Sequence, residues 1–468
     1  MTRRRLTRWA LAAFVTAGAG LAVDVPVANA QGRAPRSFTG IFGGGPPPDP
    51  NRSRQEFSLT ANLLAGYDDN LVVGSGTAPP TGPDAAGYMG DVQLDFEYFR
   101  GKADRSFTVR GGGHGTRYSE SGVGFQNDAS IGLTGQTRLR RRDQLRADAV
   151  FTYDSFSTLG SFAGLEPELG IDDVPSATPD ARLSATSSIA GQAGLNYSLA
   201  LGRDDAIDLQ YGFTARRYAE SDDPTVESPG DVDTHRAGAG YSRGLGRFLS
   251  LRAGYDYSNA DAQDRLGRIP LVAHTITAGP VWQRQVSRTR RLEMSASFGA
   301  QYVETVTSGD ERVPVEYWVP SGSASMRVDL GRTWALWADY DRGTTVLPQV
   351  ITSALTTDAV SVSTGGRLAN RVHLSFTTGY AKGASDAATG GTDDYTTVLT
   401  GTQLQYRVTR RISATASYTY YEYRFDNQTD LPEGFPPTAS RNAVRVGVTI
   451  WLPLLGRYTT EPGSGGGR

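Results

Sequence analysis

The residues best suited to acid–base or metal chemistry are spread thinly along this chain. The four histidines, His114, His235, His274 and His373, lie far apart, and no HExxH pair brings two of them together. There is no G-x-S-x-G elbow and no phosphate-binding P-loop, and the absence of cysteine excludes disulfides and thiolate metal sites. We therefore expect no catalytic residue, no metal site and no cofactor, and we predict that the protein is not an enzyme.

Charged side chains instead recur at every second position of runs that are otherwise apolar. In "YMGDVQLDFEYF", Asp91, Asp95 and Glu97 alternate with valine, leucine and phenylalanine. Alternate residues of a β-strand point to opposite faces, so each such run has one apolar face and one charged face. A charged face suits the wall of a water-filled channel, in which acidic and basic groups orient a polar solute. The residues predicted to line the channel are Asp91, Asp95, Glu97, Arg110, Arg146, Asp148, Arg252, Asp256, Arg327, Asp339 and Arg445.

A structural role for these residues is the alternative. Arginines and carboxylates occur in comparable number, and they can satisfy one another as ladders along an inner wall without acting on any solute. On an apolar, lipid-facing surface each arginine would cost about 2–4 kcal/mol near the bilayer midplane, and each carboxylate less. Both interpretations therefore place the charges on the inner face.

The elements that must position these residues are predicted to be β-strands. Period-two alternation with β-branched and aromatic residues recurs in 18 runs, although 16 strands remain possible. The predicted spans are 55–67, 87–99, 105–118, 127–139, 144–154, 186–199, 206–218, 232–243, 248–258, 271–284, 291–304, 317–330, 334–342, 357–368, 372–382, 395–407, 412–424 and 441–452.

The connections between these runs alternate between short and long. "RGKAD", "RRRD", "GRDD", "ANR" and "VTRR" are tight, whereas the connections between them are acidic and rich in Pro, Gly and Ser. Short turns on one side and long loops on the other are typical of an all-β, transmembrane, antiparallel up-and-down β-barrel. A soluble β-propeller is the competing fold, but its connections do not alternate so sharply.

The N-terminal segment predicts export. "MTRRRLTR" is basic, "WALAAFVTAGAGLAV" is apolar, and "ANA" provides a small-residue cleavage site, so residues 1–30 resemble a secretory signal peptide. We predict a flexible periplasmic leader at residues 31–54, the barrel at residues 55–454 and a flexible tail at residues 455–468. No other stretch is long and apolar enough for a membrane helix, and a net charge of −2 gives no reason to expect a nucleic-acid partner.

Tyrosines end the runs that lead into long loops. Tyrosine has an apolar ring and a polar tip, so it suits the boundary between hydrocarbon and headgroups. The predicted aromatic girdles contain Tyr67, Tyr153, Tyr257, Tyr302, Tyr340, Tyr380 and Tyr420 at the outer level and Trp334 and Trp451 at the inner level. Tyr118 and Tyr218 also end runs but have the wrong parity, and a bulge at residues 111–113 could restore that of Tyr118.

Two other segments carry functional expectations. The longest connection, residues 155–181, is the candidate for a loop that folds inward and constricts the channel. Residues 57–71, "FSLTANLLAGYDDNL", with "GYDDN" at their end, resemble the opening hairpin of the β-barrel porin 2 family. The resemblance implies an outer-membrane barrel of a kind often associated with exopolysaccharide gene clusters, and a passive conduit without catalytic residues.

We therefore predict a porin-like channel in the outer membrane of a Gram-negative-type bacterium, through which small hydrophilic solutes diffuse passively. Two alternatives are an exopolysaccharide secretion channel and a structural or adhesive barrel plugged by its own loops. The expected partners are the lipid bilayer and lipopolysaccharide, the barrel-insertion machinery, and small polar solutes or polysaccharide. Nothing in the sequence favours one oligomeric state.

Overall fold

The chain forms a single closed β-barrel in a computed structural model. The structure describes residues 53–69, 86–102, 104–119, 125–155, 157–159, 181–184, 187–219, 231–264, 267–287, 290–306, 313–331, 333–346, 354–385, 394–426 and 437–459. Its elements are β1 (Ser53–Asp68), β2 (Gly87–Lys102), β3 (Arg105–Tyr118), β4 (Gln126–Arg140), β5 (Asp143–Asp154), β6 (Ser157–Leu159), β7 (Ala181–Ser184), β8 (Ser188–Ala200), β9 (Asp205–Tyr218), β10 (Val232–Gly244), β11 (Leu249–Asp264), β12 (Gly267–Ser287), β13 (Arg290–Val306), β14 (Pro314–Asp329), β15 (Ala335–Val346), β16 (Ala354–Ala369), β17 (Val372–Ser385), β18 (Asp394–Arg407), β19 (Ile412–Asp426) and β20 (Thr438–Thr459).

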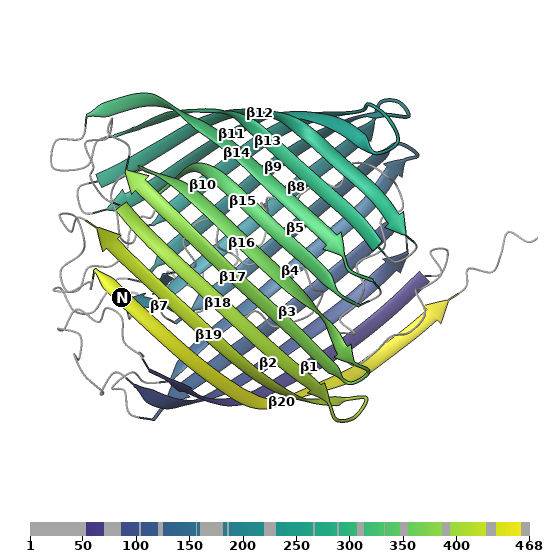
Figure 1. Cartoon of the computed structure of the whole chain (residues 1–468), viewed down its shortest axis with the longest axis vertical. Coiled ribbons are helices and arrows are strands. Elements are labelled where there is room, and N and C mark those ends of the chain that lie inside the picture. Colours follow the sequence, from purple (N-terminus) through teal and green to yellow (C-terminus); the bar gives the residue numbers. More distant parts are fainter. Residues whose placement is uncertain are drawn as a thin grey trace, which may run out of the picture.

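Eighteen of these strands make one antiparallel sheet that closes on itself. Each strand pairs with the next along the chain, β5 pairs with β8, and β1 pairs with β20 (Figure 1). Closure leaves no unpaired edge, because the first and last strands satisfy each other's backbone groups. The predicted 18-stranded antiparallel barrel is confirmed, and each predicted span overlaps one strand of the sheet.

The structure adds a small hairpin and lengthens the barrel at both ends of the chain. β6 and β7 pair with each other in a separate two-stranded sheet within the long connection after β5. β1 begins at Ser53 and β20 extends to Thr459, so the barrel takes in residues predicted as leader and tail. The predicted signal peptide and most of the candidate constriction loop lie outside the described residues. Among those that are described, no helix has the length and apolarity needed to cross a membrane.

The two ends of the barrel differ in their connections, and we name them accordingly. At the turn end, β4 joins β5 through residues 141–142, and β16 joins β17 through residues 370–371. Gly331, in the turn after β14, has a φ of 97°, which glycine adopts without strain. The loop end is the opposite one, where most connections are longer. The predicted alternation of short and long connections is borne out except between β11 and β12, which only residues 265–266 separate.

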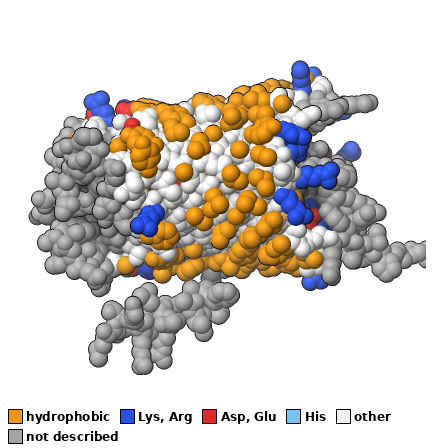
Figure 2. Space-filling view, turned by 90° about the horizontal axis from the view of Figure 1, so that it is seen from below, with side chains coloured by type: hydrophobic (Ala, Val, Ile, Leu, Met, Phe, Trp, Pro, Cys, Tyr) orange, Lys and Arg blue, Asp and Glu red, His pale blue; other side chains and the backbone are white. Residues whose placement is uncertain are grey.

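The outer face of the barrel is apolar. Large hydrophobic side chains at alternate positions are exposed there, among them Phe298 (72%), Ile276 (60%) and Val446 (54%). Hydrophobic side chains form a broad band over the face seen in Figure 2, and Lys and Arg gather toward its ends. The opposite parity points into the barrel, and we call that side the luminal face.

The aromatic residues of the outer face lie in cross-strand rows. Tyr257, His274, Tyr302 and Trp318 are register partners in turn across β11 to β14. Their ring centroids are 5.2, 6.2 and 5.2 Å apart. All seven tyrosines predicted for the outer girdle have outward parity, namely Tyr67, Tyr153, Tyr257, Tyr302, Tyr340, Tyr380 and Tyr420.

Two aromatic residues differ from the sequence prediction. The register of β3 against β2 and β4 runs without a shift through residues 111–113, so no bulge turns Tyr118 outward, and its side chain is buried on the luminal face. Trp451 was predicted for the inner girdle, but it has the luminal parity of buried Thr449. Strict alternation in β20 is the reason, because Val446 and Val448 occupy the outward positions. Trp334 does lie at the turn end with outward parity, and its indole donates to the carbonyl of Arg367 at 3.0 Å.

Candidate solute pathway on the luminal face

The luminal face carries all of the residues predicted to line a channel. Each has the parity opposite to that of the exposed apolar residues in its own strand, which places the eleven side chains inside the barrel. They are Asp91, Asp95, Glu97, Arg110, Arg146, Asp148, Arg252, Asp256, Arg327, Asp339 and Arg445. Sharing this face does not by itself assign them a role in transport.

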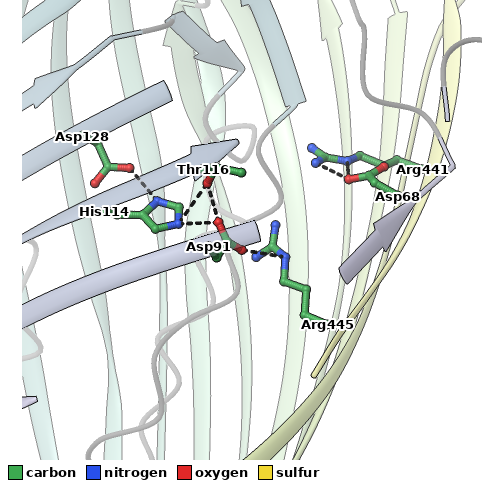
Figure 3. A network of polar contacts seen from close by, with 7 residues as sticks. All are labelled: Asp68, Asp91, His114, Thr116, Asp128, Arg441 and Arg445. Carbon is green, nitrogen blue, oxygen red and sulfur yellow. Dashed lines mark hydrogen bonds and ion pairs between the residues drawn. The ribbon is translucent and has the colours of Figure 1, made fainter. Parts of the chain in front are cut away.

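A polar network connects the luminal faces of β2, β3, β4 and β20 (Figure 3). The two ring nitrogens of His114 lie 2.9 Å from a carboxylate oxygen of Asp91 and 2.9 Å from one of Asp128. Thr116 donates a short hydrogen bond to Asp91, and the Arg445 Nε lies 3.6 Å from the same carboxylate. Ionised carboxylates only accept hydrogen bonds, so a ring that donates to both would be an imidazolium. The network therefore compensates a carboxylate, that of Asp91, which is almost inaccessible to solvent.

A second polar contact joins the first strand of the barrel to the last, and we call it the seam clasp. Arg441 on β20 donates to Asp68 on β1 through Nε at 2.7 Å, and both side chains are buried. Asp69 accepts hydrogen bonds from the Asn442 backbone at 2.6 Å and from its side chain at 2.7 Å. These partners are 373 residues apart in sequence. The seam clasp consists of Asp68, Asp69, Arg441 and Asn442, and it fastens the barrel at the loop end.

The seam clasp gives a structural meaning to "GYDDN". Tyr67 faces outward and packs edge-on against Tyr88, with ring centroids 5.6 Å apart. A Cβ on Gly66 would lie 2.5 Å from the carbonyl oxygen of Val444, so only glycine fits at this point of the seam. Sequence reasoning noted the motif as a family resemblance but missed Asp68 and its partner Arg441. Nothing local in the sequence indicates which distant strand will close the barrel.

Other luminal charges also have partners. The Arg110 Nε donates to Glu97 across β2 and β3 at 3.2 Å. Asp256 accepts from the Gln210 side chain at 2.7 Å. Arg327 lies 3.4 Å from Asp329, and its guanidinium stands over the Trp337 ring, 5.1 Å from the centroid. These contacts agree with the ladder interpretation for part of the wall.

The remaining predicted residues are placed without joining the network of Figure 3. Arg146 and Asp148 are luminal neighbours two residues apart on β5, and Asp148 is buried. Arg252 lies half-buried on β11, opposite Ser242. Asp339 on β15 is exposed to the lumen. Of the eleven residues, only Asp91 and Arg445 belong to the network.

The glycine run in β3 lets neighbouring side chains lie across that strand. A Cβ on Gly112 would lie 2.2 Å from Asp95 Oδ1, on the luminal side. A Cβ on Gly111 would lie 2.6 Å from the Phe96 ring, on the outer side. Glycine here makes room for Asp95 on one face and for Phe96 on the other, within a regular strand.

Near the loop end, the luminal face of β18 and β19 changes character. Tyr395, Tyr421, Tyr423 and Phe425 point inward, and we call these residues the inner aromatic collar. Tyr395 and Tyr423 are 0% exposed, and the Tyr423 and Phe425 ring centroids are 5.6 Å apart. The Tyr395 hydroxyl lies 3.1 Å from that of Thr357. The sequence analysis predicted charged residues on the luminal face and did not identify these aromatic residues, whose side chains are buried.

The described residues contain no cluster of three or more His, Asp or Glu side chains arranged to hold a metal ion. His235 and His274 face outward, where each ring meets a tyrosine hydroxyl, from Tyr211 at 3.0 Å and from Tyr255 at 2.8 Å. His373 is luminal, on β17 near the turn end.

Comparison with known proteins finds similarity to solved outer-membrane barrels. No protein-family model matches the sequence, and no curated protein matches it either. Acinetobacter baumannii OccAB2 has 11% identity and a TM-score of 0.40, with coverage of 86% of this chain and 98% of that one. Pseudomonas aeruginosa OccK8 (OprE) has 14% identity and a TM-score of 0.39, with coverage of 86% and 98%. The ferric-catecholate import receptor Fiu of Escherichia coli K12 has 8% identity and a TM-score of 0.41, with coverage of 85% and 81%.

Proposed function

We propose that this chain is a channel of the bacterial outer membrane through which small hydrophilic solutes diffuse passively. The observation that carries the proposal is the division of its two faces. An apolar outer face on a closed sheet suits lipid, because closure satisfies every backbone group of the sheet inside hydrocarbon. Charged residues such as Asp256, Arg252 and Asp339 occupy the opposite face.

The size of the barrel supports a conduit. Barrels of about 16–18 strands are wide enough to leave an aqueous channel, whereas barrels of about eight are filled by their own side chains. Paired charges of both signs give the wall a field that orients dipolar solutes without binding them tightly. Passive diffusion through such a barrel needs neither a cofactor nor an energy source.

A second candidate function is a barrel that is closed at rest, either a gated exopolysaccharide exporter or a plugged structural barrel. The observation favouring it is the inner aromatic collar, because Tyr395 and Tyr423 are 0% exposed and so are not in contact with water in the lumen. A gated exporter would open only with a periplasmic partner or a polysaccharide substrate. The resemblance of residues 57–71 to the β-barrel porin 2 family is in keeping with this candidate but stays a prediction.

Conductance separates the two candidates. The purified barrel is reconstituted into planar bilayers in symmetrical potassium chloride, and single-channel currents are recorded. Steady open steps are expected for a diffusion channel, and proteoliposomes should swell in small sugars but not in large dextrans. A silent membrane would contradict passive diffusion.

A collar variant then distinguishes a plug from an inactive preparation. Tyr423→Ala removes a large side chain from the collar and should raise conductance if packing there closes the lumen. Tyr418→Ala is the matched control, because this tyrosine lies on the same strand but is 40% exposed on the outer face. Equal single-channel currents from the two variants would show that the collar does not close the lumen.

A further inference from the structure

A row of charged side chains crosses the outer face near the loop end. Arg342 on β15 lies opposite Asp358 on β16, and Asp358 lies opposite Lys382 on β17. They share outward parity with Tyr340 and with Tyr380, which is 46% exposed. Along each strand the row lies two residues beyond the level of the tyrosines, toward the loop end.

The carboxylate in this row, that of Asp358, already accepts hydrogen bonds from other residues of the protein. Asp358 accepts from Arg342 Nη1 at 3.1 and 3.0 Å and from the Tyr340 hydroxyl at 2.7 Å. Lys382 is exposed, and it forms no ion pair with any carboxylate in the part of the chain that the structure describes. Arg342 Nε is buried without a hydrogen-bond partner among the described residues, so Lys382 provides the accessible, unpaired charge of the row. The row therefore has an excess positive charge, carried by Lys382.

Two other cations near this level of the outer face are neutralised within the protein. Arg217 contacts two carboxylates, Asp233 at 2.7 Å and Asp231 at 3.5 Å. Arg424 contacts Asp426 at 2.8 Å. Lys382 differs, because the one carboxylate opposite it, that of Asp358, pairs with Arg342 instead.

We propose that Arg342 and Lys382 bind a phosphate group on the saccharide headgroup of an outer-leaflet glycolipid. The inference rests on the proposed outer-membrane location. Tyrosine rings mark the boundary between hydrocarbon and headgroups, so a row just beyond them lies at the level of lipid phosphates. The Lys382 ammonium is an accessible point charge suited to phosphate, and the Arg342 guanidinium, whose side chain is 36% exposed, adds positive charge beside it. One strand separates the two residues, so their backbones are about 10 Å apart and both long side chains can reach one headgroup.

Lipid binding in detergent tests the site. Delipidated protein is mixed with bis-phosphorylated lipid A or with the same lipid after phosphatase treatment, and bound copies are counted by native mass spectrometry. Wild type should prefer the phosphorylated lipid. The double variant Arg342→Gln/Lys382→Gln should bind it roughly 30-fold more weakly, from the usual contribution of two cations near a membrane surface.

A matched pair controls for lost positive charge. Arg100 and Arg105 are exposed with outward parity at the turn end, so Arg100→Gln/Arg105→Gln removes the same charge from the opposite rim and should leave lipid A binding unchanged. Equal binding by wild type and the Arg342/Lys382 variant, or an equal loss in the control pair, would overturn the proposed site. Heat-modifiable migration on SDS gels confirms that each variant is a closed barrel.

Conductance of the same preparations separates this inference from the proposed function. Preference for the phosphorylated lipid without open conductance steps would contradict the passive channel but support the lipid site. Open conductance steps without a preference for the phosphorylated lipid would support the channel but contradict the lipid site.

Discussion

The position of a charged residue in this barrel depends on the partners that compensate its charge as much as on its parity in the strand. Asp91 is buried on the luminal face, and it is tolerated there because His114, Thr116 and Arg445 surround its carboxylate. An unpaired buried carboxylate would cost several kcal/mol. His114 is the centre of this arrangement, since among the described residues it alone contacts both Asp91 and Asp128.

Replacement of His114 by glutamine should therefore destabilise the barrel by about 1–3 kcal/mol, the usual cost of losing charge-assisted hydrogen bonds to a buried carboxylate. Urea unfolding of the protein in lipid vesicles, followed by tryptophan fluorescence, measures the change. His235→Gln is the control, because that ring contacts a neutral tyrosine hydroxyl on the outer face. Equal losses in the two variants would show that the luminal network adds nothing.

At the scale of the elements, the critical contact is the pairing of β1 with β20. Seventeen of the sheet's eighteen strands pair with the next strand of the sheet along the chain, whereas closure brings together strands from the two ends of the described chain. The seam clasp reinforces this pairing with a buried ion pair between Asp68 and Arg441. Gly447 also belongs to the seam, because a Cβ there would lie 2.0 Å from the Leu63 carbonyl oxygen.

Removal of either charge of the clasp should loosen the seam. Arg441→Ala leaves Asp68 buried without its guanidinium, and we expect a loss on the order of 3–5 kcal/mol in the free energy of unfolding. The charge swap Asp68→Arg/Arg441→Asp should restore part of that loss. Heat-modifiable migration and urea unfolding report the result.

The exposed pair of Arg424 and Asp426 supplies the comparison for the clasp. Their side chains are 63% and 47% exposed, so Arg424→Ala should cost less than about 1 kcal/mol. If Arg441→Ala behaved like Arg424→Ala, the seam would be held by backbone pairing alone.

At the scale of the whole molecule, lipid and water are divided by the sheet. Phe298 and Asp339 illustrate the two sides, the first on the outer face of β13 and the second on the luminal face of β15. A charged group on the lipid side would cost free energy in hydrocarbon, and an apolar band on the luminal side would exclude water from the lumen. The division is therefore a property of the assembled barrel.

Single-cysteine labelling tests this division directly, because the chain has no cysteine of its own. In proteoliposomes, Asp339→Cys should react with a charged, membrane-impermeant thiol reagent. Phe298→Cys should resist that reagent, and a fluorophore attached there before reconstitution should be quenched by brominated lipids. The opposite pattern, or a mature protein that stays monodisperse without detergent, would contradict the membrane barrel.

The sequence by itself determined the elements and their facing. Period-two alternation identified every strand of the sheet and placed residues such as Asp95 and Arg252 on the luminal face, because side-chain direction in a strand depends only on parity. The prediction was wrong for Trp451, because its place near the strand end was given more weight than its parity. The bulge suggested at residues 111–113 is also absent, because this glycine run forms a regular strand.

Only the tertiary structure decided which residues meet. The partner of Asp68 lies 373 residues away, and its identity depends on where the barrel closes. The inner aromatic collar and the pairing of Asp358 with Arg342 likewise depend on the register between strands. Parity is a local property of the backbone, whereas register and closure result from packing the whole sheet, so no single stretch of sequence encodes them.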